Sequence, residues 1–326
     1  MNYPKFSIII PNLNQGQFIE EAITSVLNQN YPNLELFVFD GGSTDNSIEV
    51  IKKYDKYITY WESIEDKGQS HAINKGIRKC TGDYFNWLNA DDYLEKNCLT
   101  EVAKVINTEN QIVIGKLKTF GNTRSQIKRT ELFNGNKAKS IGRVLLAQPA
   151  MFFPKSILNF NTETVNETLQ YSFDREWWIK MVLENSAFEL KTVDFVISNF
   201  RYHDDSKTVN NSYQYFYSDN SQIYAYLARV IGLTEISNIL LKSKFIESKS
   251  EYKPTFDNDI LIENNELLSK AINFYLIEIG HVLLKFSRFN DLKEILNHVR
   301  FSHLDFVDKR LYLTLQLKNQ LKLFIH

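Results

Sequence analysis

Short apolar runs that alternate with helical patterns are the feature that most constrains the fold of this chain. Residues 6–10 and 34–39 are rich in large and β-branched apolar side chains, as in strands buried on both faces, and 84–88 is similar. Between them, 18–27 and 72–77 carry apolar residues at helical spacing. Strands that alternate with helices predict βαβ units around a mostly parallel sheet, an α/β fold.

Polar and glycine-rich segments follow each of these runs. In parallel sheets, ligands bind outside the carboxyl ends of the strands, so we expect the chemistry just after residues 10, 39 and 88. In the segment DGGSTD, the glycines let the backbone approach a ligand, and Asp40 can accept hydrogen bonds from a base or ribose. A turn followed by a helix cap explains the same residues. This pattern alone does not separate the two interpretations.

Two adjacent carboxylates, Asp91 and Asp92, follow the third run. Carboxylates where a buried strand emerges are costly unless something neutralises them. Mg²⁺ or Mn²⁺ is a natural partner, because hard cations prefer oxygen ligands and bridge to phosphates. A helix N-terminus enriched in acids is the alternative, since the helix dipole favours it.

Composition bounds the class of protein. The chain has 326 residues, which suggests two domains, and its 43% hydrophobic content is enough for a full core. A net charge of −1 argues against nucleic-acid binding. We find no signal peptide, no apolar stretch near the roughly 20 residues of a membrane span, and no redox or metal spacing in Cys80 and Cys98. These features predict a cytoplasmic protein.

The distribution of glycine and proline predicts the domain boundary. Ten of twelve glycines and five of six prolines precede residue 205, and the remainder is rich in helix formers. We therefore expect a turn-rich α/β domain at 1–207 and a mostly helical region at 208–326. Within it, 267–286 forms one helical stripe, and a helix is favoured over a strand at 304–323.

Five ordered segments resemble the inverting glycosyltransferases of family 2, which have the GT-A fold. They lie within residues 4–207 and read FSIIIPNLNQGQFIEEAITSVLNQNYPNLELFVFDGGSTDNS, DKGQSHAINKGIRKCTGDYFNWLNADD, QPAMFFPKS, FDREWWIKM and FRYHDDSKT. The resemblance implies a GT-A domain with a C-terminal helical extension. It also implies transfer of a sugar from a nucleotide-diphosphate donor, UDP-sugar favoured, to a saccharide or lipid-linked acceptor in cell-surface polysaccharide synthesis.

The resemblance also implies roles for individual residues. Nucleotide contacts would come from Pro11, Asn14 and Asp40. The wall facing donor ribose and sugar would include Asp66, Gly68, Gln69, Asn74 and Lys75. At the Asp-x-Asp position stand Asn89, Ala90 and Asp91; metal and diphosphate would be met by Asp91, Asp92 and His203, with Ser206 and Lys207 nearby. Asp174 would be the catalytic base.

Four positions depart from the family pattern: Asn89 replaces the first Asp of the metal motif, Gly41 a second Asp, Phe173 an acid before the base, and Lys180 a frequent Arg. A non-catalytic nucleotide-sugar scaffold is therefore an alternative. A nucleotidyltransferase is another, although residues 12–16 lack a phosphate-binding cation. Homodimerisation and peripheral membrane association stay open for 208–326, but near-balanced charges there do not support an electrostatic anchor.

Overall fold

The computed structural model describes residues 3–121, 125–129, 136–143, 147–158, 165–184, 188–204, 206–207, 213–246 and 251–322. The chain divides into two compact units. The first comprises Met1–Thr130, Leu146–Trp177 and Asn185–Asn211, and the second Glu131–Leu145, Trp178–Glu184 and Ser212–His326. The last crossing, at 211/212, lies close to the predicted 207/208 boundary, whereas two earlier segments also join the second unit.

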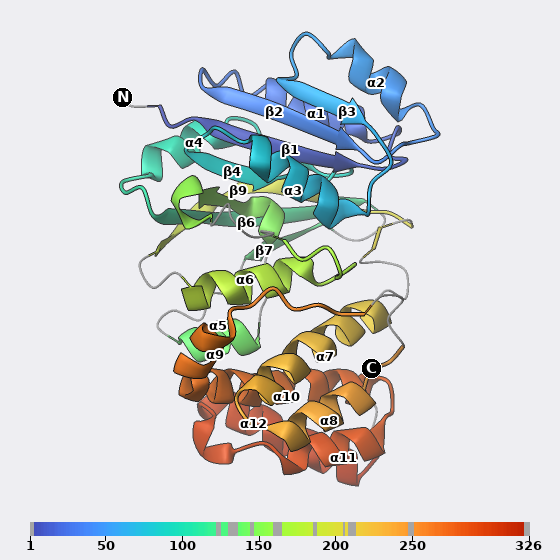
Figure 1. Cartoon of the computed structure of the whole chain (residues 1–326), viewed down its shortest axis with the longest axis vertical. Coiled ribbons are helices and arrows are strands. Elements are labelled where there is room, and N and C mark those ends of the chain that lie inside the picture. Colours follow the sequence, from blue (N-terminus) through green and yellow to red (C-terminus); the bar gives the residue numbers. More distant parts are fainter. Residues whose placement is uncertain are drawn as a thin grey trace. The chain divides into compact units, whose positions relative to one another are not determined.

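The first unit is built on one sheet, in which the strands nearest the N-terminus are parallel (Figure 1). Strands β1, β2, β3 and β4 are parallel, in the order β3-β2-β1-β4, and the sheet continues through β8, β6, β9 and β5, with β7 beside β6. The bounds are β1 Phe6–Asn12, β2 Leu34–Asp40, β3 Tyr60–Ser63, β4 Tyr84–Trp87, β5 Tyr93–Leu94, β6 Gln111–Gly121, β7 Gln126–Arg129, β8 Met151–Pro154 and β9 Glu189–Tyr202.

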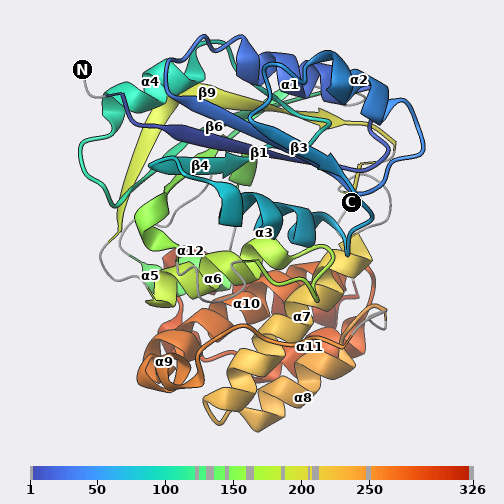
Figure 2. The same cartoon turned by 45° about the horizontal axis from the view of Figure 1, so that its top comes forward.

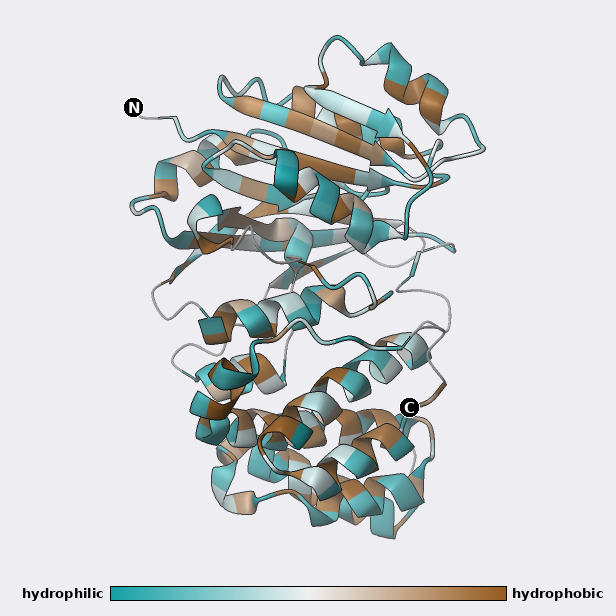
Figure 3. Ribbon diagram, in the orientation of Figure 1, coloured by the Kyte–Doolittle hydropathy of each residue, from teal (hydrophilic) through white to brown (hydrophobic). Residues whose placement is uncertain are grey.

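Helices cover both faces of this sheet. Figure 2 shows α1, α2 and α4 on one face and α3 on the other. Figure 3 shows apolar colouring along the central strands, and β1 is buried along its whole length, as a strand covered on both faces requires. The sequence prediction for the three strands and their helices is confirmed; the bounds are α1 Ile19–Leu27, α2 Ser47–Lys53, α3 Gln69–Lys79 and α4 Cys98–Val105.

The second unit is helical. Its central helix, α10 (Asn265–Lys285), confirms the stripe predicted from the sequence. Among the described residues it is the one helix long and apolar enough to span a membrane, but 72% of its most apolar window is buried within the protein. The other elements are α5 Lys137–Gly142, α7 Tyr213–Val230, α8 Thr234–Lys242, α9 Asn258–Glu263, α11 Phe289–Asn297, η3 Phe301–His303 and α12 Phe306–Gln320, the last as favoured over a strand.

Helix α5 belongs to this unit because it packs against α10. A side chain at Gly142 would lie 2.1 Å from the carbonyl oxygen of Ala271, so only glycine permits this approach. The buried Lys139 donates to Asp305 and pairs with Asp308, each at 2.6 Å. These long-range contacts could not be read from local sequence, which explains why residues 131–145 were assigned to the first domain.

Candidate active site

The carboxyl ends of β1, β2 and β3 meet at Asp40. The parallel register places Asp40 beside Asn12 on one side and Ser63 on the other. Asn12 Nδ2 donates to Asp40 Oδ1 at 2.6 Å, and Ser63 Oγ donates to Oδ2 at 2.6 Å. Ser43 donates its backbone N–H (2.9 Å) and its hydroxyl (2.5 Å) to the same carboxylate. The strand ends are thus joined by one buried carboxylate.

Asp40 is buried with no exposed surface. Burial alone would raise its pKa, but hydrogen bonds from Ser43, Ser63 and Asn12 outweigh that effect and hold the pKa below its usual range. The sequence analysis assigned Asp40 a contact with the base. In the structure the Asp40 oxygens accept hydrogen bonds that shape the loop, whereas Asn14 is exposed and has φ 51°. Pro11 is buried within β1.

The loop before α3 brings Asp66 to the end of β2. Asp66 Oδ1 accepts the Gly68 N–H at 2.8 Å, and a side chain at Gly41 would lie 3.2 Å from the Asp66 carboxylate. A side chain at position 41 would therefore require the Asp66 carboxylate to shift by a few tenths of an ångström. Gly68 itself has φ 115°, a conformation that favours glycine.

Two residues predicted to line the donor wall are engaged within the protein. Asn74 is buried; it donates to the Val165 carbonyl at 2.7 Å and accepts the Val165 N–H at 3.0 Å. Lys75 pairs with Glu62 at 2.8 Å. Asn74 therefore fixes the segment that begins at residue 165, and Lys75 holds α3 against β3.

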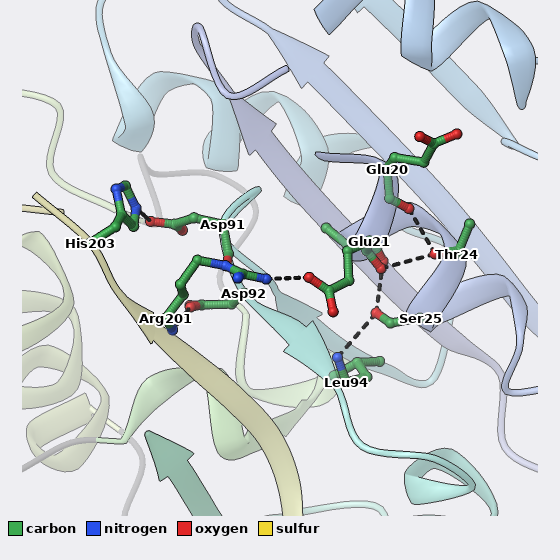
Figure 4. Close-up of polar contacts among 10 residues, drawn as sticks. Glu20, Glu21, Thr24, Ser25, Asp91, Asp92, Leu94, Arg201 and His203 are labelled. Carbon is green, nitrogen blue, oxygen red and sulfur yellow. Dashed lines mark hydrogen bonds and ion pairs between the residues drawn. The ribbon is translucent and has the colours of Figure 1, made fainter. Parts of the chain in front are cut away.

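The loop after β4 carries Asp91, and the chain directly after β9 carries His203. His203 Nε2 lies 2.9 Å from Asp91 Oδ2, and the two side chains point at each other (Figure 4). The Phe18 ring packs on the imidazole with 4.6 Å between ring centroids. Among described residues no group hydrogen-bonds His203 Nδ1, so Asp91 is the polar partner of this ring. Ala90 is buried beside them.

Asp92 has a different environment from Asp91. It is 1% exposed, and its oxygens accept hydrogen bonds from the Arg201 N–H at 2.9 Å and from Asn89 Nδ2 at 3.0 Å. Burial and then the charge of Asp91 raise its pKa well above the usual range. Of the two carboxylates, Asp91 is therefore the more accessible to a ligand. Asp92, which was also predicted to meet the metal, accepts hydrogen bonds that hold the loop in place.

Arg201 fixes the backbone of this loop, and the sequence analysis gave it no role. Its Nε donates to the Asp91 carbonyl at 3.0 Å, and its guanidinium pairs with Glu21 (Figure 4). The guanidinium also lies 4.8 Å from the centre of the Phe18 ring and 4.5 Å from that of Phe120. Arg201 and His203 are two residues apart at the end of β9, where period-two spacing places side chains on one face. That spacing was the available sequence signal.

Hydrogen bonds that run through Gln69, the first residue of α3, link Lys207 to the metal motif. Lys207 Nζ donates to Gln69 Oε1 at 3.1 Å, and Gln69 Nε2 donates to Asn89 Oδ1 at 2.7 Å. Asn89 then donates to Asp92. Ser206 accepts the His203 N–H at 3.1 Å and donates to the Arg201 carbonyl at 3.2 Å. The structure thus brings residues from three predicted motifs into one network.

Asp174 lies in the first turn of α6 (Phe173–Glu184). The first turn is anchored by Trp177, whose ring lies 5.2 Å from that of Trp87 at the end of β4. Trp177 is buried. Burial raises the pKa of Asp174, while the Arg175 N–H and the charge of Lys207 oppose this shift. A carboxyl with a raised pKa is a stronger base than an ordinary aspartate.

A comparison with protein families decides what this arrangement is. The family described as Glycosyl transferase family 2 matches residues 7–168, which contain the strand ends and the metal motif. Residues 7–168 of this chain belong to glycosyltransferase family 2. Asp174, His203 and Lys207 follow this family 2 segment in the chain and join its network in the same compact unit.

Curated relatives cover parts of the chain. An uncharacterized glycosyltransferase of Haemophilus influenzae is 39% identical over 102 residues, 30% of this chain and 41% of its own. Poly(ribitol-phosphate) beta-N-acetylglucosaminyltransferase TarP of Staphylococcus aureus is 25% identical over 218 residues, 65% of this chain and 62% of its own. The chain therefore spans less than two thirds of the length of the first curated relatives that it matches.

Solved structures show the same fold. Residues 1–349 of S. aureus TarS in complex with UDP-GlcNAc match with a TM-score of 0.60 at 15% identity, covering 99% of this chain and 93% of that one. Mannosyltransferase PcManGT from Pyrobaculum calidifontis, in complex with GDP-Man and Mn2+, matches with a TM-score of 0.50 at 16% identity, covering 99% and 88%. The GT-A-like sheet and the C-terminal helices predicted from the sequence are thus both present.

The side chains available as metal ligands at the family 2 site fit a divalent cation. Asp91 offers a carboxylate oxygen and His203 an imidazole nitrogen, ligand types that Mn²⁺ accepts. The described residues contain no group of three or more His, Cys, Asp or Glu placed to hold a metal. Cations that bind few protein ligands complete their shell with substrate phosphates and water. Asp91 and His203 would accordingly hold a cation together with the donor.

Replacing Asn89 with Asp tests why an amide stands in this motif. The change removes the donor to Asp92 and places a second carboxylate 3.0 Å from it. We expect the free energy of unfolding to fall by about 1–3 kcal/mol, the usual cost of an unmade buried hydrogen bond. Urea unfolding measures this, with Asn89→Ala as the uncharged control. Equal stability of Asn89→Asp and wild type would show that the Asn89–Asp92 bond is unimportant.

Proposed function

We propose that this chain is a metal-dependent inverting glycosyltransferase that transfers a sugar from a nucleotide-diphosphate donor to an acceptor hydroxyl. The observation that supports this most is the grouping of Asp91, His203 and Asp174 in one unit. Asp91 and His203 converge beyond β4 and β9, and the first turn of α6, which carries Asp174, is anchored to the end of β4 through Trp177. Two carboxylates in such different environments suit two different tasks.

The first task is to stabilise the departing diphosphate. A bound cation acts there as a Lewis acid that offsets the developing negative charge. Asp91 and His203 would hold this cation, Arg201 keeps the Asp91 backbone in place, and Lys207 adds a positive charge on the same side of the site as Asp174. In the described structure Lys207 also bridges Gln69 and the Gln170 carbonyl.

The second task is to activate the acceptor. Asp174 accepts the proton of the attacking hydroxyl while the new carbon–oxygen bond forms and the bond to the diphosphate breaks. One displacement from the side opposite the leaving group inverts the anomeric carbon. The raised pKa of Asp174 makes it a stronger base, and the charge of Lys207 favours its ionised form.

The donor is proposed to be a UDP-sugar, with an N-acetylhexosamine favoured. This rests on the TarS complex with UDP-GlcNAc and on the name of TarP, both similar to this chain. The acceptor would be a saccharide or lipid-linked saccharide in cell-surface polysaccharide synthesis. A cytoplasmic location is part of the proposal, and the two buried, unpaired cysteines fit a reducing compartment.

Calorimetry with a panel of UDP-, GDP- and TDP-sugars, with Mn²⁺ or with EDTA, tests the proposal. We expect binding of one UDP-sugar that depends on the metal, followed by slow release of UDP when that donor is incubated with the protein. NMR of the product then reports its anomeric configuration. Binding without release of UDP under any acceptor condition would favour the scaffold alternative, and failure to bind any donor would contradict the proposed function.

A further inference from the structure

Helix α12 exposes a row of large apolar side chains. Phe306 is 75% exposed, Leu313 53% and Leu317 56%, and spacings of seven and four residues place them on one side of the helix. Val307 and Leu321, each 57% exposed, extend the row at its two ends. We call these five residues the α12 face. An isolated exposed leucine is ordinary, but a contiguous row indicates an interaction surface.

The charged residues of α12 that form no ion pair among the described residues are all basic. Arg310 is exposed within the row, Lys309 and Lys318 are half-buried along the same helix, and Lys322 is exposed just after it. In the part of the chain that the structure describes, no carboxylate forms an ion pair with any of these four residues. Lys309 lies 5.3 Å from the centre of the Phe301 ring, which is itself 43% exposed.

The acidic residues of this segment, Asp305 and Asp308, are paired with basic residues of the same unit. Asp308 is fully buried between Lys139 at 2.6 Å and Arg143 at 2.7 Å. Asp305 also pairs with Lys139, at 2.6 Å. Burial opposes its ionisation, but the bond from Lys139 lowers its pKa to about 2, so it stays ionised and paired at neutral pH. The near balance of charge in the sequence of 208–326 therefore does not hold on the surface of α12.

We propose that the α12 face binds the surface of an anionic phospholipid bilayer. An amphipathic helix with phenylalanine and leucine on one side and lysine and arginine beside them lies in the plane of such a surface. The apolar side chains enter the boundary of the acyl chains, and the long basic side chains reach the headgroups. This inference does not depend on the proposed glycosyl transfer, since it concerns only the second unit.

A second copy of the chain is a poorer occupant for this face. A two-fold dimer would place the α12 face against itself, because the same patch is used on both subunits. The four basic residues of one helix would then lie beside those of its partner, and like charges at close range repel. An anionic membrane instead attracts every one of them.

Sedimentation with vesicles tests the proposal without any sugar donor. We expect the wild-type chain to bind vesicles of equimolar phosphatidylglycerol and phosphatidylcholine, to lose this binding at high salt, and to ignore pure phosphatidylcholine. Leu317→Glu should weaken binding at least about tenfold, because it places a negative charge in the apolar row. Ile262→Glu is the matched control: Ile262 is 53% exposed on α9, outside the face, and its variant should bind like wild type.

Several results would overturn the proposal. The proposal is wrong if the wild-type chain fails to bind the anionic vesicles, or if the Leu317→Glu variant binds them as well as wild type does. It is also wrong if the Ile262→Glu variant loses as much binding as the Leu317→Glu variant. A dimer in analytical ultracentrifugation that Leu317→Glu dissociates, together with no vesicle binding, would assign the face to a second copy. The double variant Lys309→Glu and Lys318→Glu tests the electrostatic part separately, and circular dichroism checks that each variant is folded.

Discussion

Asp174→Asn should lower turnover by about 10²–10⁴-fold and leave the affinity for the donor nearly unchanged, because a positioned base contributes that much to rate. The substitution keeps the size of the side chain and its place at the start of α6. It removes only the capacity to take a proton. Single-turnover kinetics of the preferred donor, with calorimetry of donor binding on the same samples, separates the two quantities.

The pH dependence of turnover gives the same assignment a second readout. Asp174 must be ionised to act, so turnover should rise with pH through its pKa, and burial raises that pKa above the usual range. Lys207→Met removes a charge that opposes the shift, so the rise should move to higher pH. In Asp174→Asn the rise should disappear.

Asp194→Asn is a suitable control for Asp174→Asn, because Asp194 is a 76% exposed carboxylate on β9 paired with Lys116. It should turn over like wild type at every pH. An Asp174→Asn variant with full activity would remove Asp174 from the mechanism.

Asp91→Ala should abolish the contribution of metal to donor binding. The change removes one of the two converging ligands and leaves the His203 ring without its polar partner. Because a metal Lewis acid contributes several kcal/mol of transition-state stabilisation, we expect turnover to fall at least about 100-fold and the donor affinity to become the same in Mn²⁺ and in EDTA. Calorimetric titration of donor in Mn²⁺ and in EDTA measures it.

Glu49→Ala controls for loss of one surface carboxylate, since Glu49 is exposed on α2. It should bind donor and metal like wild type. Should Asp91→Ala retain metal-dependent binding, the cation must be held elsewhere, and the pairing of Asp91 with His203 would be structural only.

The sequence predicted a candidate site at the loops after three buried strands, and the structure brings these loops together, while the roles of individual residues there stay predictions. Buried strands and helices follow from local apolar spacing, so the loops after β1, β2 and β4 could be placed in advance. Asp40 and Asp92, predicted to meet nucleotide and metal, are both buried and accept hydrogen bonds from groups within the protein. Hydrogen bonds between distant segments decide this, and no local pattern reports them.

Arg201 shows the opposite case, a residue whose importance the sequence understated. Its guanidinium joins Glu21, Phe18 and the Asp91 backbone, which are separated from it by more than a hundred positions. Gly41 likewise appeared to be a missing acid. The close approach of Asp66 shows that a larger side chain would not fit there without displacing it.

The sequence by itself determined the α/β sheet, its family and the helical character of the C-terminal region, because apolar periodicity and ordered motifs are local properties. Only the tertiary structure decided which charges remain available on the surface. The acids Asp305 and Asp308 are paired with Lys139 and Arg143, which lie more than 160 positions earlier in the chain. Composition counts all of these charges equally, whereas pairing within the protein reduces the negative charge that Asp305 and Asp308 present to a binding partner.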